Sequence, residues 1–165
     1  MKKSSRRRSG ASTPLGIVQQ IAQVRDLANA LIDEELASLG IEGIAPAHGG
    51  VLAFLFRQTE AVPIKDLVAF TGRAKSTVTG IVQTLERHGY LERSDDPLDS
   101  RVSSIVLTDK GRALQADFRA ITGRLLEAVY GDMPQRDRET LVRLLSEVEH
   151  NLASRPPKES RSKSP

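Results

Sequence analysis

The sequence contains no cysteine, and aromatic residues make up only 4% of its 165 residues. Without cysteine the chain cannot form a disulfide, a thiolate-ligated zinc site or a thiol-based redox switch. Such a composition fits a cytoplasmic protein. The hydrophobic content of 39% is sufficient for a core, and with so few aromatic side chains we expect that core to be aliphatic and mostly helical.

Long apolar runs are also missing. No run approaches the roughly 20 residues that a membrane-spanning helix needs. The basic N-terminus is followed by LGIVQQIAQVRD, which is too polar to be the apolar region of a signal peptide. We therefore expect no membrane partner.

Signatures of catalysis and of metal binding are absent as well. The serines and histidines do not form a nucleophile-elbow or phosphate-loop pattern, so the chain is not expected to be an enzyme or to carry a cofactor. His48, His88 and His150 fall in three separate predicted helices. Their spacing predicts no metal site, because zinc needs several converging ligands.

The net charge of +3 conceals an uneven distribution. Residues 1–12 carry five basic residues and no acid, and residues 153–165 carry four basic residues and one acid. Subtracting the +5 and +3 of these tails leaves −5 for residues 13–152. Both tails are rich in Ser, Lys, Arg or Pro and poor in apolar residues, so we expect them to be disordered. Basicity alone is therefore weak support for DNA binding.

Helical periodicity predicts a long first helix, three short helices and two longer helices. The long helix is expected to begin with Thr13 as N-cap and Pro14 at its first position, and to end at Gly40. The other predicted helices span residues 47–57, 64–70, 75–88, 110–130 and 135–152. The outer helices have apolar stripes that no large lobe covers, which favours pairing with a second copy.

Two short alternating stretches, 91–93 and 102–107, predict a β-hairpin directly after the helix at 75–88. Pro97 between them cannot continue a strand ladder, because proline has no N–H. Gly89 marks the end of the preceding helix, since glycine readily adopts the left-handed conformation found there. A helix followed by a charged hairpin is typical of winged helix-turn-helix proteins. The predicted fold class is thus mostly α with a small β wing.

Several short motifs accompany this hairpin. They are the apolar set Val78, Ile81, Val82 and Leu85, the sequence HGYL at 88–91, the wing sequence DPLDSR at 96–101 and the sequence LTDKG at 107–111, with Pro46-Ala47-His48 and Met133-Pro134 outside them. With these motifs, residues 14–152 resemble the MarR-type transcriptional regulators. The resemblance implies a homodimer, joined by its terminal helices, that binds a pseudo-palindromic operator in double-stranded DNA. It also implies a repressor released by a small molecule, here expected to be a phenolic or aromatic acid, in a pocket lined by helices 14–39, 47–57 and 110–130.

The start of the helix at 75–88 supplies the first group of DNA-binding candidates. A recognition helix points its early residues into the major groove, and its N-terminal dipole favours phosphate. Lys75 and Ser76 are assigned to phosphate, and Thr77 and Thr79 to phosphate or a base. Gln83, further along, can pair with an adenine edge. The alternative is an ordinary solvated polar face.

The hairpin supplies the second group. The guanidinium of Arg101 suits a narrow minor groove, where the potential is most negative. Asp99 can orient it through a charge-assisted hydrogen bond, and Arg93 on the facing strand is a further phosphate candidate. The alternative is a surface ion pair of little energetic consequence.

The chain departs from the family pattern in three places. Ala74 stands where a capping serine is expected, so the start of the helix is weakly capped. Gly80 stands where relatives often have an arginine, and Gln83 with Thr84 replaces a common Asp-Arg pair. Gly80 either allows close approach to the groove or removes a base contact.

The resulting domain prediction assigns a winged helix-turn-helix lobe to residues 45–107 and a dimerisation region to 13–44 and 108–152, with basic tails at 1–12 and 153–165. Two other functions stay open. One is a winged-helix module for protein–protein contact that has lost DNA binding, and the other is a small-molecule-binding dimer with a secondary role on DNA.

Overall fold

The computed structural model describes residues 16–95 and 103–154. The predicted helix start at Thr13 and Pro14 and the wing residues Asp99 and Arg101 lie outside the described residues. The chain divides into two compact units, residues 1–125 and 126–165, and each unit is described by itself.

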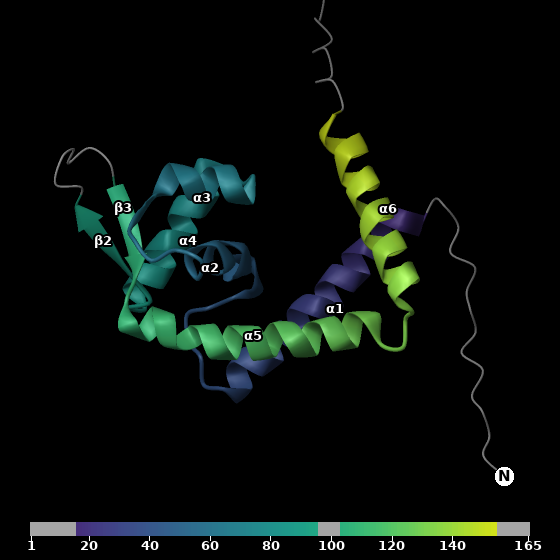
Figure 1. Cartoon of the computed structure of the whole chain (residues 1–165), viewed down its shortest axis with the longest axis horizontal. Helices are drawn as coiled ribbons and strands as arrows, with labels where there is room; N and C mark the ends of the chain where they lie inside the picture. The colour runs from purple at the N-terminus through teal and green to yellow at the C-terminus, as the bar shows by residue number, and fades with distance from the viewer. Residues whose placement is uncertain (1–15, 96–102, 155–165) are drawn as a thin grey trace, which may run out of the picture. The chain divides into compact units, whose positions relative to one another are not determined.

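The structure is mostly helical with one small sheet, as the sequence predicts (Figure 1). In chain order the elements are α1 (Ile17–Ser38), η2 (Pro46–His48), α2 (Gly49–Leu55), β1 (Val62–Pro63), α3 (Ile64–Thr71), α4 (Lys75–Arg87), β2 (Leu91–Asp95), β3 (Ser103–Leu107), α5 (Asp109–Tyr130) and α6 (Gln135–Ala153). Among the described residues, none of these helices combines the length and the apolar character that crossing a bilayer requires.

The sheet has three antiparallel strands in the order β1-β3-β2. The predicted hairpin is confirmed, with Leu91 opposite Leu107 at its base. The third strand was not predicted: residues 62–63 fall between the predicted helices at 47–57 and 64–70, but Val62 pairs with Ile105. Pro63 is compatible with this strand because β1 lies at the edge of the sheet, where a missing N–H costs little.

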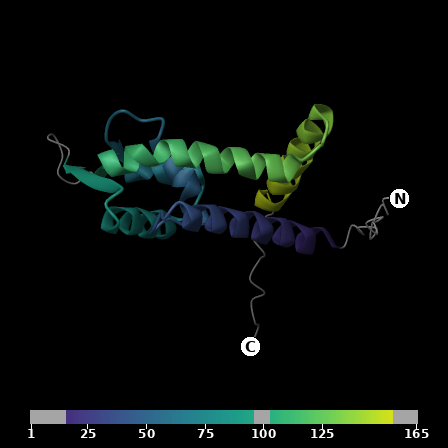
Figure 2. The same ribbon diagram turned by 90° about the horizontal axis from the view of Figure 1, so that it is seen from below.

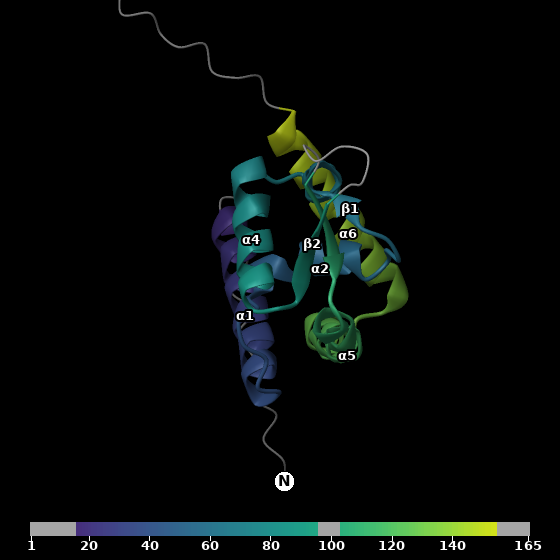
Figure 3. The same ribbon diagram turned by 90° about the vertical axis from the view of Figure 1, so that its left-hand side faces the viewer.

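The core of the first unit lies between the short helices and the sheet. Its most completely buried side chains are aliphatic and come from α2, α3, α4 and β3, namely Val51, Leu52, Leu55, Leu67, Val78, Val82, Leu85 and Ile105. Figure 3 shows α4 standing beside β2, with which it is in contact. These aliphatic side chains, contributed by short elements, thus form one core that supports α4 and the hairpin.

The hairpin passes into α5 through a tightly bonded corner. The hydroxyl of Thr108 accepts a hydrogen bond from the Gly111 N–H at 3.0 Å and donates one to the Gly89 carbonyl at 2.6 Å. The Lys110 ammonium donates to the carbonyl of His88, the C-cap residue of α4, at 2.7 Å. A Cβ at Gly111 would overlap the Tyr90 carbonyl oxygen, so only glycine allows this approach. From this corner α5 continues as one unbroken helix (Figure 2).

The outer helices bury few residues. In α1 only Leu36 is buried, while Val18 and Leu27 are 76% and 73% exposed. In α6 no residue is buried. Both outer helices thus keep several large apolar side chains exposed.

Candidate nucleic-acid interface

Helix α4 divides sharply into a buried and an exposed face. Val78, Ile81, Val82 and Leu85 are all buried, which confirms the face expected from their spacing. The opposite face, which includes Ser76, Gly80 and Gln83, is exposed. Because the apolar side is fixed in the core, the polar side is held outward as a rigid surface.

The beginning of α4 offers short polar groups and one cation to solvent. Lys75, Ser76 and Thr77 are exposed in its first turn, which contains no acidic residue. Ala74 is the N-cap, and no side chain caps the helix there, as predicted. The first N–H groups of α4 therefore lack a local side-chain acceptor, and N–H groups of this kind are suited to phosphate oxygens.

In the middle of the same face, position 80 has no side chain. Gly80 is exposed, and a Cβ built on it would meet no heavy atom within 4 Å. The Thr84 hydroxyl donates to the Gly80 carbonyl at 3.0 Å, so it is partly occupied within the helix. Thr79 is half-buried, whereas Gln83 is exposed and has a side chain long enough to reach a base edge. Arg87, exposed in the last turn, extends this face and was not singled out from the sequence.

The hairpin brings one of the predicted wing residues beside α4. Arg93 on β2 forms an ion pair with Glu86 of α4, with 3.1 Å between Nε and Oε1. Both side chains are partly exposed, so the pair contributes at most about 1 kcal/mol. It ties the hairpin to the exposed side of α4. Asp99 and Arg101 lie outside the described residues, so their geometry relative to α4 is not described.

The segment between α1 and α2 meets the start of α4. Arg73, in the turn before α4, donates a hydrogen bond from Nη1 to the Ala47 carbonyl at 3.0 Å. The next residue, His48, accepts a hydrogen bond at Nδ1 from the Ala45 N–H at 3.2 Å. Burial lowers the pKa of His48, and the positive charges of Arg73 and His88 lower it further. No pattern in the sequence connects Arg73 with Ala47.

The histidines do not form a metal site. His88 caps the end of α4, and His150 lies on the exposed surface of α6. In the described part of the chain, no group of three or more potential ligand side chains converges.

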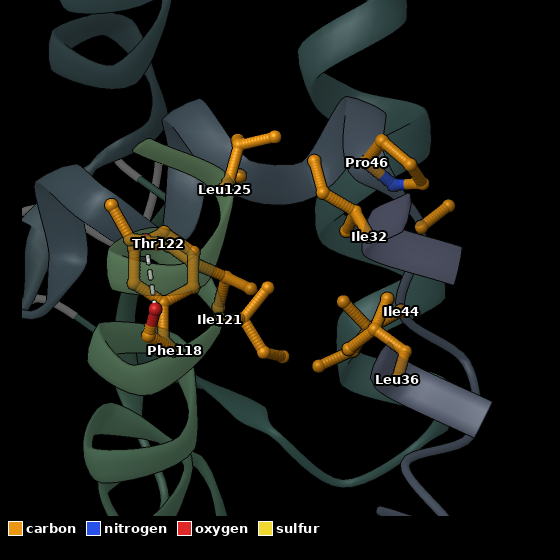
Figure 4. A pocket seen from close by; sticks show the side chains of 11 residues that line it. Ile32, Leu36, Ile44, Pro46, Phe118, Ile121, Thr122 and Leu125 are labelled. Carbon is orange, nitrogen blue, oxygen red and sulfur yellow. Dashed lines mark hydrogen bonds between the residues drawn. The ribbon is translucent and has the colours of Figure 1, made fainter. Parts of the chain in front are cut away.

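A cavity of ≈ 200 Å³ lies between α1, α2 and α5 (Figure 4). Eleven described residues line it: Ile32, Leu36, Ile44, Ala45, Pro46, Gly49, Leu52, Phe118, Ile121, Thr122 and Leu125. None is charged, and the Thr122 hydroxyl donates to the Phe118 carbonyl at 2.7 Å. Beside it, Arg124 of α5 pairs with Glu35 of α1 at 2.6 Å. The cavity lies between the three predicted helices.

Sequence comparison identifies relatives of this lobe. A model of the MarR family matches residues 42–102. The exopolysaccharide II synthesis transcriptional activator ExpG of Rhizobium meliloti is 29% identical over 136 residues, which cover 79% of this chain and 69% of ExpG. This relative is a transcriptional regulator, in agreement with the expectation that the chain is not an enzyme.

Solved structures share the fold. Wild-type MarR from E. coli, in its apo form, is 25% identical with a TM-score of 0.59, over 83% of this chain and 98% of that one. The S. aureus MepR–DNA complex is 20% identical with a TM-score of 0.71, over 85% and 98%. Bordetella bronchiseptica BpsR, whose DNA binding is regulated by 6-hydroxynicotinic acid, is 20% identical with a TM-score of 0.67, over 87% and 98%.

The family match spans the recognition helix, the turn before it and the first strand of the wing. The core that supports these elements and the corner at residues 107–111 agree with the motifs that suggested the family. Over residues 42–102 the chain matches the MarR family, and its fold is that of the winged helix-turn-helix regulators of known structure.

Proposed function

We propose that the protein acts as a homodimer that binds a pseudo-palindromic operator and represses transcription until a small molecule releases it. The observation that carries this proposal is the exposed face of α4. It presents Lys75, Ser76 and Thr77 at an uncapped helix start, with Gln83 further along the same surface. MepR, which shares the fold, has been crystallised with DNA.

In this proposal the contacts divide into two kinds. Lys75 and Ser76 bind phosphate, with Arg93 as a further phosphate contact, and they fix the register of the protein on the duplex. Gln83 reads a base edge in the major groove, with Thr77 and Thr79 near phosphate or a base. Arg101, oriented by Asp99, enters the minor groove.

A gel-shift assay against the promoter region of the protein's own gene tests DNA binding. We expect Arg101→Ala to weaken binding strongly while the dimer stays intact, and Lys75→Ala to reduce the salt slope by about 1. Arg119→Ala is the matched control, because it removes the same charge from an exposed position on α5. Equal binding by wild-type protein, Arg101→Ala and Lys75→Ala would refute these residue assignments. The absence of any specific shift would favour the protein–protein module instead.

The exposed apolar side chains of the outer helices support the proposed dimerisation. The exposed apolar residues of α1 include Val18, Val24 and Leu27, and those of α6 include Val142, Leu144 and Leu152. A second copy that covers these side chains removes a large apolar area from water, at about 25 cal/mol per Å². On this basis residues 13–44 and 108–152 form the dimerisation region, and 45–107 the DNA-binding lobe.

The cavity between α1, α2 and α5 is the effector site in this proposal. Its ≈ 200 Å³ is similar to a cavity that holds benzene, which is about 150 Å³. Its uncharged lining favours a neutral phenol over an aromatic acid, because a buried carboxylate without a partner is costly.

A thermal-shift titration with phenol and with benzoate separates these two ligand classes, since binding to the native state raises the apparent stability. We expect phenol to raise the melting temperature more than benzoate does. A larger effect of benzoate would assign the site to an acid.

A further inference from the structure

The connecting segment, residues 42–48, contacts the chain on both sides of the recognition helix α4. Just before α4, Arg73 donates to the Ala47 carbonyl at 3.0 Å. Just after α4, the Tyr90 hydroxyl donates to the Glu42 carbonyl at 2.8 Å. The His88 ring packs so closely on Gly43 that a Cβ there would overlap the ring. The position of α4 therefore depends on the conformation of this segment.

The conformation at Ala47 depends in turn on His48. The His48 N–H donates to the Ala45 carbonyl at 2.9 Å, and the Ala45 N–H donates to Nδ1 of His48 at 3.2 Å. These two bonds close the single turn of η2, to which Ala47 belongs. Nδ1 can accept a hydrogen bond only while the imidazole is neutral, with its proton on Nε2.

We propose that neutral His48 is a positioning residue for the recognition helix: it holds η2 so that the Ala47 carbonyl receives Arg73 and fixes the start of α4. This inference rests on the proposed DNA-binding function. No side-chain cap bond fixes the start of α4, because its N-cap residue is Ala74. Protonation removes the acceptor for the Ala45 N–H and places a positive charge opposite Arg73. The expected consequence is weaker operator binding in mild acid.

Charged and titratable groups on neighbouring elements face His48 and affect its pKa. Arg73 faces it from the turn before α4, and His88 faces it from the end of that helix. Lys110 of α5 is bonded to the His88 carbonyl, and the carboxylate of Glu42 lies at the start of the segment near Tyr90. Burial lowers the pKa of His48 from 6.5, and the neighbouring Arg73 and His88 lower it further. The unfolded chain therefore binds this proton first, so the stabilising contribution of neutral His48 is present above pH 6.5 and is lost as the pH falls through the folded pKa.

The sign of the effect distinguishes this mechanism from general electrostatics. Protonation of histidines adds positive charge to the protein, and added positive charge strengthens attraction to the phosphate backbone. A purely electrostatic response would therefore give tighter binding in acid. The proposed mechanism gives weaker binding.

The test compares operator affinity, at constant salt, at about pH 7.5 and at a pH below the folded pKa of His48, which an NMR titration of the imidazole locates. His48→Asn keeps a hydrogen-bond acceptor near the position of Nδ1 but does not titrate in this range. His150→Asn is the matched control, since His150 is exposed on α6.

We expect wild-type protein and His150→Asn to bind on the order of fivefold more weakly in acid, the size of effect that loss of one hydrogen bond gives. His48→Asn should bind equally at both pH values or more tightly in acid. Wild-type protein that binds as tightly in acid as at neutral pH would overturn the inference, and so would an equal loss in His48→Asn.

A second measurement does not use DNA. In amide NMR spectra of the full chain, the signals of Ala45 and of Ala74 at the start of α4 should titrate together with His48. Signals of Ala74 that do not follow the His48 titration would overturn the inference even if His48→Asn fails to fold. A protein that binds no DNA at either pH would refute the proposed function, while the NMR titration still decides the role of His48.

Discussion

Helices α4 and α6 are both amphipathic, but their apolar faces are buried to different extents. Four of the 13 residues of α4 are buried within its own unit, whereas none of the 19 residues of α6 is buried. The apolar side of α4 is therefore satisfied by contacts along one chain. The apolar side of α6 is not covered within its own unit, where Leu144 is 46% exposed and Leu152 62% exposed. In the proposed dimer, this difference separates the residues that fold the lobe from those that join the two copies.

Truncation of one leucine in each helix gives the largest expected contrast. Leu85→Ala removes a side chain with no exposed surface and should lower the free energy of unfolding by about 2–5 kcal/mol. Leu144→Ala, at a half-exposed position, should cost less than about 1 kcal/mol in dilute protein. Urea denaturation measures both. Equal losses would mean that α6 is as deeply packed as α4.

Introduction of a charge into α6 tests its role in assembly. Leu144→Glu should raise the dimer dissociation constant by more than about tenfold, because a carboxylate would be buried without a partner. Ser146→Asp is the matched control, since it adds a similar charge to an exposed position on the opposite side of α6. Sedimentation velocity over a range of concentrations gives the two constants. Similar constants for the two variants would remove α6 from the interface.

The corner between the hairpin and α5 should show a smaller effect on stability. Thr108→Ala loses the acceptor for the Gly111 N–H and the bond to the Gly89 carbonyl, which should cost about 1–2 kcal/mol. Thr140→Ala in α6 removes a hydroxyl that bonds only within its own helix, to Arg136, and serves as the control. Thermal unfolding compares them, and an unchanged Thr108→Ala variant would show that the corner is held by other contacts.

The smallest expected effect concerns two helical glycines in open positions. Gly80→Ala and Gly123→Ala each add a Cβ that meets no atom within 4 Å, so each should stabilise its helix by about 0.5–1 kcal/mol. Only Gly80→Ala should alter operator affinity, because Gly80 lies on the exposed face of α4. Gel shifts with both variants decide this point. Unchanged affinity in Gly80→Ala would refute a close approach of DNA at that position.

Local signals in the sequence predict most of the helices. Period-3.6 spacing and capping residues depend on neighbours within a turn or two. For this reason the buried face of α4, the missing cap at Ala74 and the helix end at Gly89 were all predicted. The strand at Val62 and Pro63 was missed, because two residues carry no periodicity and β1 exists only through pairing with β3.

The candidate site was predictable only in part, for the same physical reason. Lys75, Ser76 and Gln83 were identified because helical geometry sets their face once the apolar face is known. The bond from Arg73 to Ala47 joins residues 26 positions apart. The ion pair of Arg93 with Glu86 joins a strand to a helix. Contacts of this kind depend on how elements pack, and no spacing in the sequence encodes them.

The apolar cavity and the exposed face of α4 share no described residue. Its lining residues come from α1, the connecting segment, α2 and α5, and none of those in the described chain comes from α4. In the proposed regulator, substitution of Ile32, Phe118 or Leu125 would change which effector fits the cavity and leave the exposed groups of α4 unchanged. The effector preference and the DNA contacts of the proposed regulator would then change independently of each other.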